Sequence, residues 1–157
     1  MATALANVER VRRSLATGSP PRHFYVGLLG LSTYEAAKLH DKVEEGLSFE
    51  ALERLRRALD LPVSRFAELV RIPPRTLARR KEAGRLQPEE SDRLLRLSRI
   101  VGLALMLFEG GLDEARAWLL TSHPALDNEV PLEFAGTEVG AREVENLIGR
   151  LEHGIPL

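Results

Sequence analysis

The most constraining feature of this sequence is a helical pattern over residues 88–108 that becomes almost wholly apolar in its second half. Pro88 suits the first turn of a helix, and Gly110-Gly111 marks its end. Between Ile100 and Phe108 apolar residues occupy nearly every side of the predicted helix. Such a helix must be covered on every face. We therefore expect a helical fold built around this segment, with a second subunit supplying part of the cover in so short a chain.

Further helical patterns fill most of the remaining chain, and no alternating strand pattern competes with them. Ser32 and Glu35 fit a capping box for a helix that runs to Glu45 and stops at Gly46, and Ser48 caps the next helix. Other helices are expected in these places: short ones after Pro62 and after Pro73-Pro74, one over 113–120, and one over 141–151. The first thirty residues carry several glycines and prolines, so they are predicted to be mostly irregular, with a short helix over Val8–Leu15. The predicted fold class is all-α.

The composition argues against an enzyme. The chain of 157 residues has no cysteine, which excludes disulfides, thiolate zinc sites and a cysteine nucleophile. Its four histidines do not recur at metal-ligand spacing, and neither a glycine-rich phosphate loop nor a Gly-x-Ser-x-Gly motif is present. We expect no cofactor, no metal and no catalytic residues.

No membrane association is expected either. The longest apolar run, Val101–Phe108, is far too short to cross a bilayer, and no signal peptide opens the sequence. We expect a cytoplasmic protein.

Charge is segregated along the chain although the net charge is only −1. Residues 62–99 contain ten basic and five acidic side chains, whereas residues 100–157 contain three basic and ten acidic ones. A basic segment suits a polyanion, and an acidic one suits a cationic partner surface or simple solubility. The two parts of the chain are therefore candidates for two different partners.

The basic segment has the form of a helix-turn-helix unit, because two short helices are joined by the tight turn Arg71-Ile72-Pro73-Pro74. In the second helix Leu77 and Ala78 are predicted to face inward. Guanidinium groups and a hydroxyl on the outer face suit contacts with phosphates and base edges, although a merely solvated basic helix is the alternative. The candidate DNA-binding residues are Arg65, Arg71, Arg75, Thr76, Arg79, Arg80, Lys81 and Arg85.

Several motifs together resemble the Xre/MbcA/ParS-type antitoxins over roughly residues 45–157. They are Leu77-Ala78-Arg79-Arg80, the run from Gly84 to Leu97, Ala115-Arg116-Ala117-Trp118-Leu119-Leu120, His123-Pro124-Ala125-Leu126, Pro131-Leu132-Glu133, and the ending from Gly140 to Gly154. The resemblance predicts an Xre-like helix-turn-helix domain (31–98) followed by a toxin-binding and dimerisation domain (99–157), and the partly irregular first thirty residues form an N-terminal arm (1–30) before them.

The resemblance also implies partners. Such antitoxins are generally homodimers that bind operator DNA, repress their own operon and cover the NAD⁺ pocket of a RES-fold toxin. Pyrophosphate recognition requires a cationic pocket, to which an acidic domain would be drawn. The candidate toxin-binding residues are Trp118, Arg150, His153, Gly154, Ile155, Pro156 and Leu157. Trp118 as a core residue and His153 as a cation at a helix end are the ordinary alternatives.

Two positions depart from the family pattern. Pro73 replaces the serine usual before the recognition helix, and the lost cap costs about 1 kcal/mol of local helix stability. Residues 127–130 replace a glycine-rich, often basic loop, which puts a toxin contact there in doubt. Two other functions stay open: a stand-alone dimeric regulator of transcription, and a protein-binding adaptor whose helix-turn-helix unit has lost its affinity for DNA.

Overall fold

The computed structural model describes residues 2–156, and side chains from residue 5 onward. Every regular element in this part of the chain is a helix and none is a strand, which confirms the all-α prediction. The elements are α1 (Ala2–Ala16), η1 (Phe24–Leu29, a 3₁₀ helix), α2 (Ala36–Glu45), α3 (Phe49–Ala58), α4 (Val63–Leu69), α5 (Pro74–Ala83), α6 (Pro88–Leu107), α7 (Leu112–Leu119), η2 (Pro124–Leu126, 3₁₀), α8 (Pro131–Phe134) and α9 (Glu138–Glu152).

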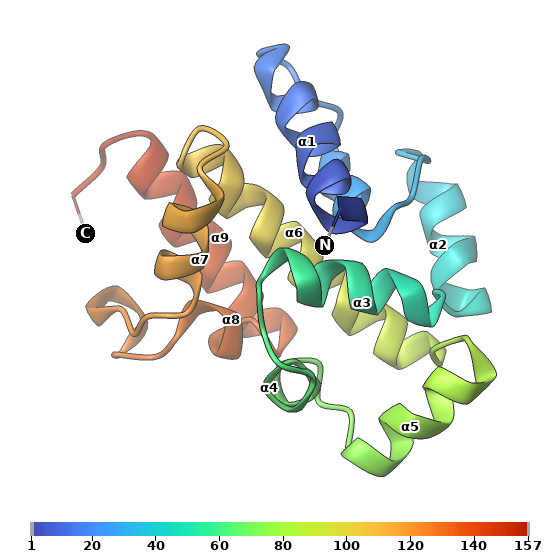
Figure 1. Cartoon of the computed structure of the whole chain (residues 1–157). Helices are drawn as coiled ribbons and strands as arrows, with labels where there is room; N and C mark the ends of the chain where they lie inside the picture. The colour runs from blue at the N-terminus through green and yellow to red at the C-terminus, as the bar shows by residue number, and fades with distance from the viewer. Residues whose placement is uncertain (1, 157) are drawn as a thin grey trace.

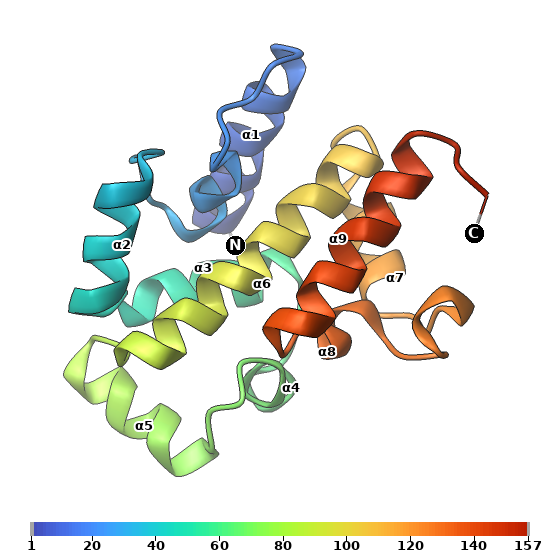
Figure 2. The same cartoon turned by 180° about the vertical axis from the view of Figure 1, so that it is seen from behind.

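Helix α6 is central, and its own chain covers it. Figures 1 and 2 show η1 and α1 on one side of α6 and α9 beside it on the other. Ile100, Val101, Ala104 and Leu105 are buried, while Leu103, Leu107 and Phe108 toward the end of the helix are partly buried. The N-terminal segment and α9 therefore cover much of this helix within one chain, and a second subunit over its partly buried end stays a prediction.

The N-terminal segment is more ordered than its composition indicates. Instead of a short helix over Val8–Leu15 within an irregular arm, α1 occupies residues 2–16 and η1 follows the intervening turn. Val8 and Val11 are buried, and Arg12 Nε donates to the carbonyl oxygen of Gly110 at 2.8 Å. Packing of α1 against η1 and α3, and of η1 against α6, stabilises this segment, and the local sequence does not encode these contacts.

The closest approach in this packing is at Gly102 on α6. A Cβ atom there would lie 2.5 Å from the Cβ of Tyr25, so only glycine allows η1 to approach α6 this closely. Phe24 and Tyr25 are both buried. The glycine in the apolar helix is thus a packing site for the N-terminal segment.

The predicted helix ends are partly confirmed. Ser48 caps α3, its hydroxyl accepting from the amide of Ala51 at 3.2 Å, and α2 ends at Gly46 with a φ of 89°. The capping box at Ser32 is wrong: α2 begins at Ala36, and residues 31–35 are irregular. Gly30 ends η1 in the left-handed region, and Glu35 precedes α2 in an extended conformation without a side-chain cap.

The C-terminal helices differ from the prediction mainly in their bounds. Helix α9 begins at Glu138, earlier than the predicted Ala141, because the Thr137 hydroxyl accepts from the amide of Gly140 at 3.1 Å and caps it. Val144, Leu147 and Ile148 form its buried stripe as expected. The loop predicted between 121 and 140 contains η2 and α8, each opened by a proline.

None of the helices in residues 2–156 is both long enough and apolar enough to span a lipid bilayer.

Candidate functional site

Helices α4 and α5 form the helix-turn-helix unit that the sequence predicts. In the turn, Arg71 has a φ of 55°, and the amide of Ile72 donates to the carbonyl of Ala67 at 3.0 Å. Ile72, Phe66 and Leu77 are buried and hold the two helices together. Arg93 of α6 donates to the carbonyl of Val70 at 2.9 Å, which fixes the turn against the central helix.

The first turn of α5 has no side-chain cap. Pro73 stands at the N-cap and Pro74 at the first helical position, where its fixed φ suits a helix start. Leu77 faces the core as predicted, but the expectation for Ala78 is wrong, because Ala78 is exposed. Since α5 carries one buried residue, its remaining faces are open to solvent or to a partner.

Four of the predicted DNA-binding cations are uncommitted. Arg71, Arg75, Arg79 and Lys81 are exposed, and none of them has an ion-pair partner in the described part of the chain. Arg79 makes only a long 3.4 Å contact with the hydroxyl of the half-buried Thr76. These side chains belong to α5 and the turn before it, so their charge is available to a polyanion.

Arg80 is bound within the protein. Its Nε lies 2.9 Å from each carboxylate oxygen of Glu90, and Glu90 in turn accepts from the amide of Gln87 at 3.2 Å and closes a capping box on α6. Burial alone would raise the pKa of Glu90, but hydrogen bonds from Arg80 and Gln87 and the charge of Arg80 outweigh it and lower that pKa. Arg80 thus joins α5 to α6, whereas the Gln87/Glu90 spacing is a sequence signal for the capping box alone.

Arg65 and Arg85 are also engaged. Arg65 pairs with Glu68 at 3.1 Å and with Glu133 of α8, which links the helix-turn-helix unit to the C-terminal half of the chain. Arg85 donates to the carbonyls of Glu45 and Gly46 at 3.0 and 3.1 Å. The structure therefore separates the eight candidates into four exposed cations on α5 and the turn before it, the half-buried Thr76, and three arginines with internal partners.

The candidate toxin-binding residues lie at the other end of the molecule. In both Figure 1 and Figure 2 the C-terminus and α5 lie at opposite ends. Gly154 has a φ of 64°, its amide donates to Leu151, and the amide of Ile155 donates to the carbonyl of Arg150 at 2.9 Å, which is the Schellman pattern of a helix end. The tail beyond α9 is exposed, as are Arg150, His153, Gly154, Ile155 and Pro156, whereas Leu157 lies outside the described residues.

Trp118 fits neither of its two interpretations completely. The side chain is partly buried and packs against the core, and its ring centre lies 5.8 Å from that of His123. The indole therefore has one side in the core and part of its surface exposed beside the η2 turn. Its exposed part remains available for a partner.

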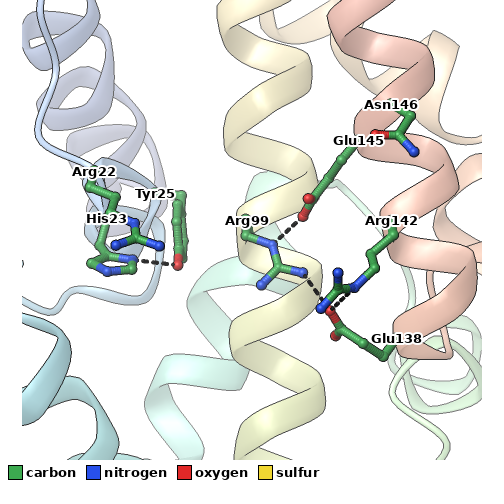
Figure 3. A pocket seen from close by; sticks show the side chains of 8 residues that line it. All are labelled: Arg22, His23, Tyr25, Arg99, Glu138, Arg142, Glu145 and Asn146. Carbon is green, nitrogen blue, oxygen red and sulfur yellow. Dashed lines mark hydrogen bonds and ion pairs between the residues drawn. The ribbon is translucent and has the colours of Figure 1, made fainter.

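A polar cleft of about 490 Å³ lies between η1 and α9 above α6, and no sequence signal indicated it (Figure 3). The hydroxyl of Tyr25 lies 2.9 Å from Nδ1 of His23 on one wall. Arg99 pairs with Glu145 and lies 3.7 Å from Glu138 on the other. The two contacts of Arg99 join residues 39 and 46 positions apart, so spacing along the chain could not predict them.

Burial and the charges in this cleft lower the pKa of His23. Burial lowers the pKa of His23, and the positive charges of Arg22 and Arg99 lower it further. Burial raises the pKa of Tyr25. Both side chains are therefore neutral at pH 7, and among the described residues no group of three His, Asp or Glu side chains could hold a metal ion.

Comparisons with known proteins match two family models to this chain. The family model of the antitoxin Xre-like helix-turn-helix domain matches residues 38–99, and that of the antitoxin Xre/MbcA/ParS C-terminal toxin-binding domain matches residues 103–154. An uncommitted basic recognition helix joined to a helical toxin-binding domain defines a protein of the antitoxin class, and neither domain is an enzymatic one.

Three relatives give the family. Antitoxin Xre of Yersinia enterocolitica (serotype O:8 / biotype 1B) is 35% identical over 128 residues, which is 81% of this chain and 86% of the relative. Antitoxin Xre of Photorhabdus laumondii subsp. laumondii is 30% identical with the same coverage, and that of Pseudomonas putida is 30% identical over 76% of this chain and 74% of the relative. The chain belongs to the Xre antitoxin family.

Proposed function

We propose that this antitoxin neutralises a RES-fold, NAD⁺-consuming toxin with its C-terminal domain and binds its own operator as a homodimer through α5. The observation that carries the proposal is that two chemically different surfaces lie at opposite ends of one small protein. Uncommitted cations surround α5, and the exposed end of α9 lies at the opposite end. One chain can therefore contact DNA and a protein without competition for the same surface.

The α5 surface suits DNA because its charges are not used internally. Arg75 and Arg79 are one helical turn apart on the exposed side of α5, and Arg71 precedes them in the turn. Guanidinium groups at this spacing can contact phosphates and guanine edges together. A homodimer would present two such helices to a two-fold symmetric operator.

The C-terminal surface suits a toxin that binds NAD⁺. Such an enzyme must present cationic groups to the pyrophosphate, and residues 100–157 carry an excess of acidic side chains. The exposed tail offers Ile155 and Pro156 as apolar anchors, with Arg150 and His153 beside them and Leu157 following. Trp118, partly exposed on α7, is the largest additional anchor.

Co-purification tests the toxin half of the proposal. The chain would be co-expressed with the product of its neighbouring gene, and NAD⁺ consumption by that product would be measured with and without the antitoxin. We expect a stable complex and suppression of NAD⁺ consumption. A neighbouring product that leaves NAD⁺ intact, or one that is not bound, would refute this half.

Gel retardation tests the DNA half. We expect the chain to retard the DNA upstream of its own gene more strongly than unrelated DNA of equal length. Equal retardation of both, or none, would instead favour the adaptor without DNA affinity. Retention of a toxin subunit from the native operon separates the antitoxin from a stand-alone regulator.

A further inference from the structure

The polar cleft between η1 and α9 lies apart from both surfaces in the proposed function. It is formed by η1 with the residues just before it, by the middle of α6 and by the first half of α9 (Figure 3). Neither α5 nor the tail that follows α9 contributes a side chain to its lining. The cleft is therefore left unused by the contacts with DNA and toxin.

The size and lining of the cleft indicate a small, strongly polar ligand. Its volume of about 490 Å³ is within the usual range for small-molecule sites and larger than a single inorganic ion requires. Every side chain that lines it carries a polar group, whereas most ligand sites and protein interfaces are centred on apolar side chains. An apolar peptide or a lipid chain would find no matching surface here.

One part of the cleft attracts anions. Arg22 is exposed, and its guanidinium has no hydrogen bond or ion pair within the described part of the chain. Arg99 and Arg142 line the same cleft from α6 and α9 (Figure 3), and the three arginines exceed the two glutamates there by one positive charge. Burial lowers the pKa of His23 most, and the charges of Arg22 and Arg99 lower it further, so the field at this wall is positive. Guanidinium groups that line one cleft suit a phosphate group.

The Tyr25 hydroxyl supplies a neutral donor beside these charges. It lies 2.9 Å from Nδ1 of His23. A neutral imidazole can donate from Nδ1 to the phenolic oxygen, which leaves the hydroxyl hydrogen free for an oxygen atom of a ligand. The buried ring of Tyr25 packs at Gly102, so the fold itself fixes the position of this hydroxyl.

The α9 wall of the cleft supplies acceptors. Glu145 pairs with Arg99 through one carboxylate oxygen, and its other oxygen accepts no hydrogen bond from residues 5–156. Asn146, which is exposed, has a side-chain amide without a partner in the same range. A carboxylate can only accept, so the matching ligand groups are hydroxyl donors. A polymer of phosphates would meet repulsion from Glu138 and Glu145, which favours a ligand with one phosphate group over a nucleic acid.

We propose that the cleft between η1 and α9 is a binding site for a small hydroxylated phosphate ester, either a sugar phosphate or a mononucleotide. The phosphate group contacts Arg22 and Arg99 and accepts from the Tyr25 hydroxyl. Hydroxyl groups of the ligand donate to Glu145 and Asn146. Such a ligand joins the N-terminal segment to the C-terminal domain, so its binding stabilises the folded chain. The inference goes beyond the proposed function, because the site takes neither DNA nor toxin.

Calorimetry and thermal unfolding of the full chain test the class of ligand. The probes are ribose 5-phosphate, AMP, inorganic phosphate and ribose. We expect ribose 5-phosphate or AMP to bind with a dissociation constant below about 1 mM and to raise the melting temperature. Inorganic phosphate and ribose should each bind at least roughly tenfold more weakly, because each makes only part of the contacts.

The same probes identify the source of the ligand and can refute the site. Tighter binding of AMP than of ribose 5-phosphate would identify a nucleotide, and the reverse order a free sugar phosphate. If neither ester binds below about 1 mM, the cleft is left to a protein contact and the proposal is overturned. Ribose or inorganic phosphate that binds as tightly as the esters would overturn it as well.

Two variants with a matched control test the phosphate contacts. Arg22 has no internal partner, and phenylalanine keeps the ring that packs at Gly102, so Arg22→Ala and Tyr25→Phe should melt close to the ligand-free wild type. Arg22→Ala should weaken binding of ribose 5-phosphate roughly tenfold or more, and Tyr25→Phe roughly threefold to tenfold. The control Arg13→Ala removes an exposed arginine of α1 outside the cleft and should leave the affinity unchanged. Unchanged affinity in Arg22→Ala, or an equal loss in Arg13→Ala, would overturn the assignment.

A further variant tests the acceptor wall separately. Asn146→Ala should weaken the binding of ribose 5-phosphate by roughly threefold or more, while the weaker binding of inorganic phosphate should not change. This split between two probes distinguishes a contact with the ligand's hydroxyl groups from a general disturbance of the cleft. An equal loss for both probes, or no loss for either, would contradict the placement of the hydroxyl groups at α9.

Discussion

Arg80 and Glu90 form a two-point contact in which the guanidinium Nε lies 2.9 Å from both oxygens of the carboxylate. Arg80 is in the last turn of the recognition helix, and Glu90 is in the first turn of the central helix. Glu90 also accepts from the amide of Gln87, so one carboxylate fixes the start of α6 and the end of α5 together. The contact orients the recognition helix, and the guanidinium of Arg80 is already paired within the protein.

Replacement of Glu90 by Gln should destabilise the protein by about 1–3 kcal/mol at pH 7, because Arg80 then loses its charged partner. The folded-state pKa of Glu90 lies below the usual 4.5, so its stabilisation is present above that pH and is lost as the pH falls through the folded value. Urea unfolding at pH 7 and near pH 3 should therefore show a difference between wild type and Glu90→Gln that shrinks in acid. The exposed neighbour gives the control Glu89→Gln, which should behave as wild type at both pH values. An equal loss in both variants would contradict the assigned role.

Arg75 and Arg79 should account for much of the salt dependence of operator binding. If each contacts one phosphate, Arg75→Ala with Arg79→Ala should lower the slope of log K against log salt by about two units. Arg142→Ala, a change at an exposed arginine on α9, should leave the slope unchanged. Arg80→Ala should lower the melting temperature, because Arg80 pairs with Glu90, and should change the slope less than the double variant does. Titrations by fluorescence anisotropy at several salt concentrations measure all four proteins, and an unchanged slope in the double variant would remove these arginines from the interface.

The same substitution should have opposite effects at two helical glycines. At Gly102 the added methyl would lie 2.5 Å from Tyr25, so Gly102→Ala should destabilise the fold by about 1–3 kcal/mol as η1 is pushed from α6. At Gly149 on α9 no atom lies within 4 Å of the added methyl, so Gly149→Ala should stabilise the fold by about 0.5–1 kcal/mol through helix propensity. Thermal unfolding of both variants measures the contrast. Equal stability of Gly102→Ala and wild type would mean that η1 does not pack as described.

The C-terminal tail should be required for neutralisation but not for folding or DNA binding. A chain that ends at His153 retains all of α9, including the buried Val144, Leu147 and Ile148. We expect its melting temperature and operator affinity to match those of the full chain, and its protection of cells from the toxin to be lost. A shorter chain that ends at Gly149 should fail in the same way. Full protection by either shortened chain would show that the tail is not a toxin contact.

Local sequence signals predict much of this fold because their physical causes are local. Ser48 caps α3 through its own hydroxyl, Gly46 ends α2, and Pro73-Pro74 separates the two helices of the helix-turn-helix unit. The period of apolar residues likewise identifies the buried stripe of α9. The motifs that resemble Xre antitoxins are confirmed by the family comparisons, which match the helix-turn-helix and toxin-binding domains.

The distribution of the arginines could not be predicted in the same way. The seven basic candidates for DNA binding looked alike as part of a basic segment, yet Arg65 pairs with Glu133 and Arg80 with Glu90. These partners lie 68 and 10 residues further along the chain, and the first pairing depends on how α4 and α8 come together. Which cations stay free for a partner is therefore a property of the packed molecule.

The sequence by itself determined that this chain is helical, that its middle is basic and its end acidic, and that it carries the motifs of an antitoxin, because helix periodicity, capping and charge are properties of neighbouring residues. Only the tertiary structure decided how the apolar face of α6 is covered. Tyr25 meets Gly102 from a segment more than seventy positions away, and contacts of that range arise from the packing of whole helices.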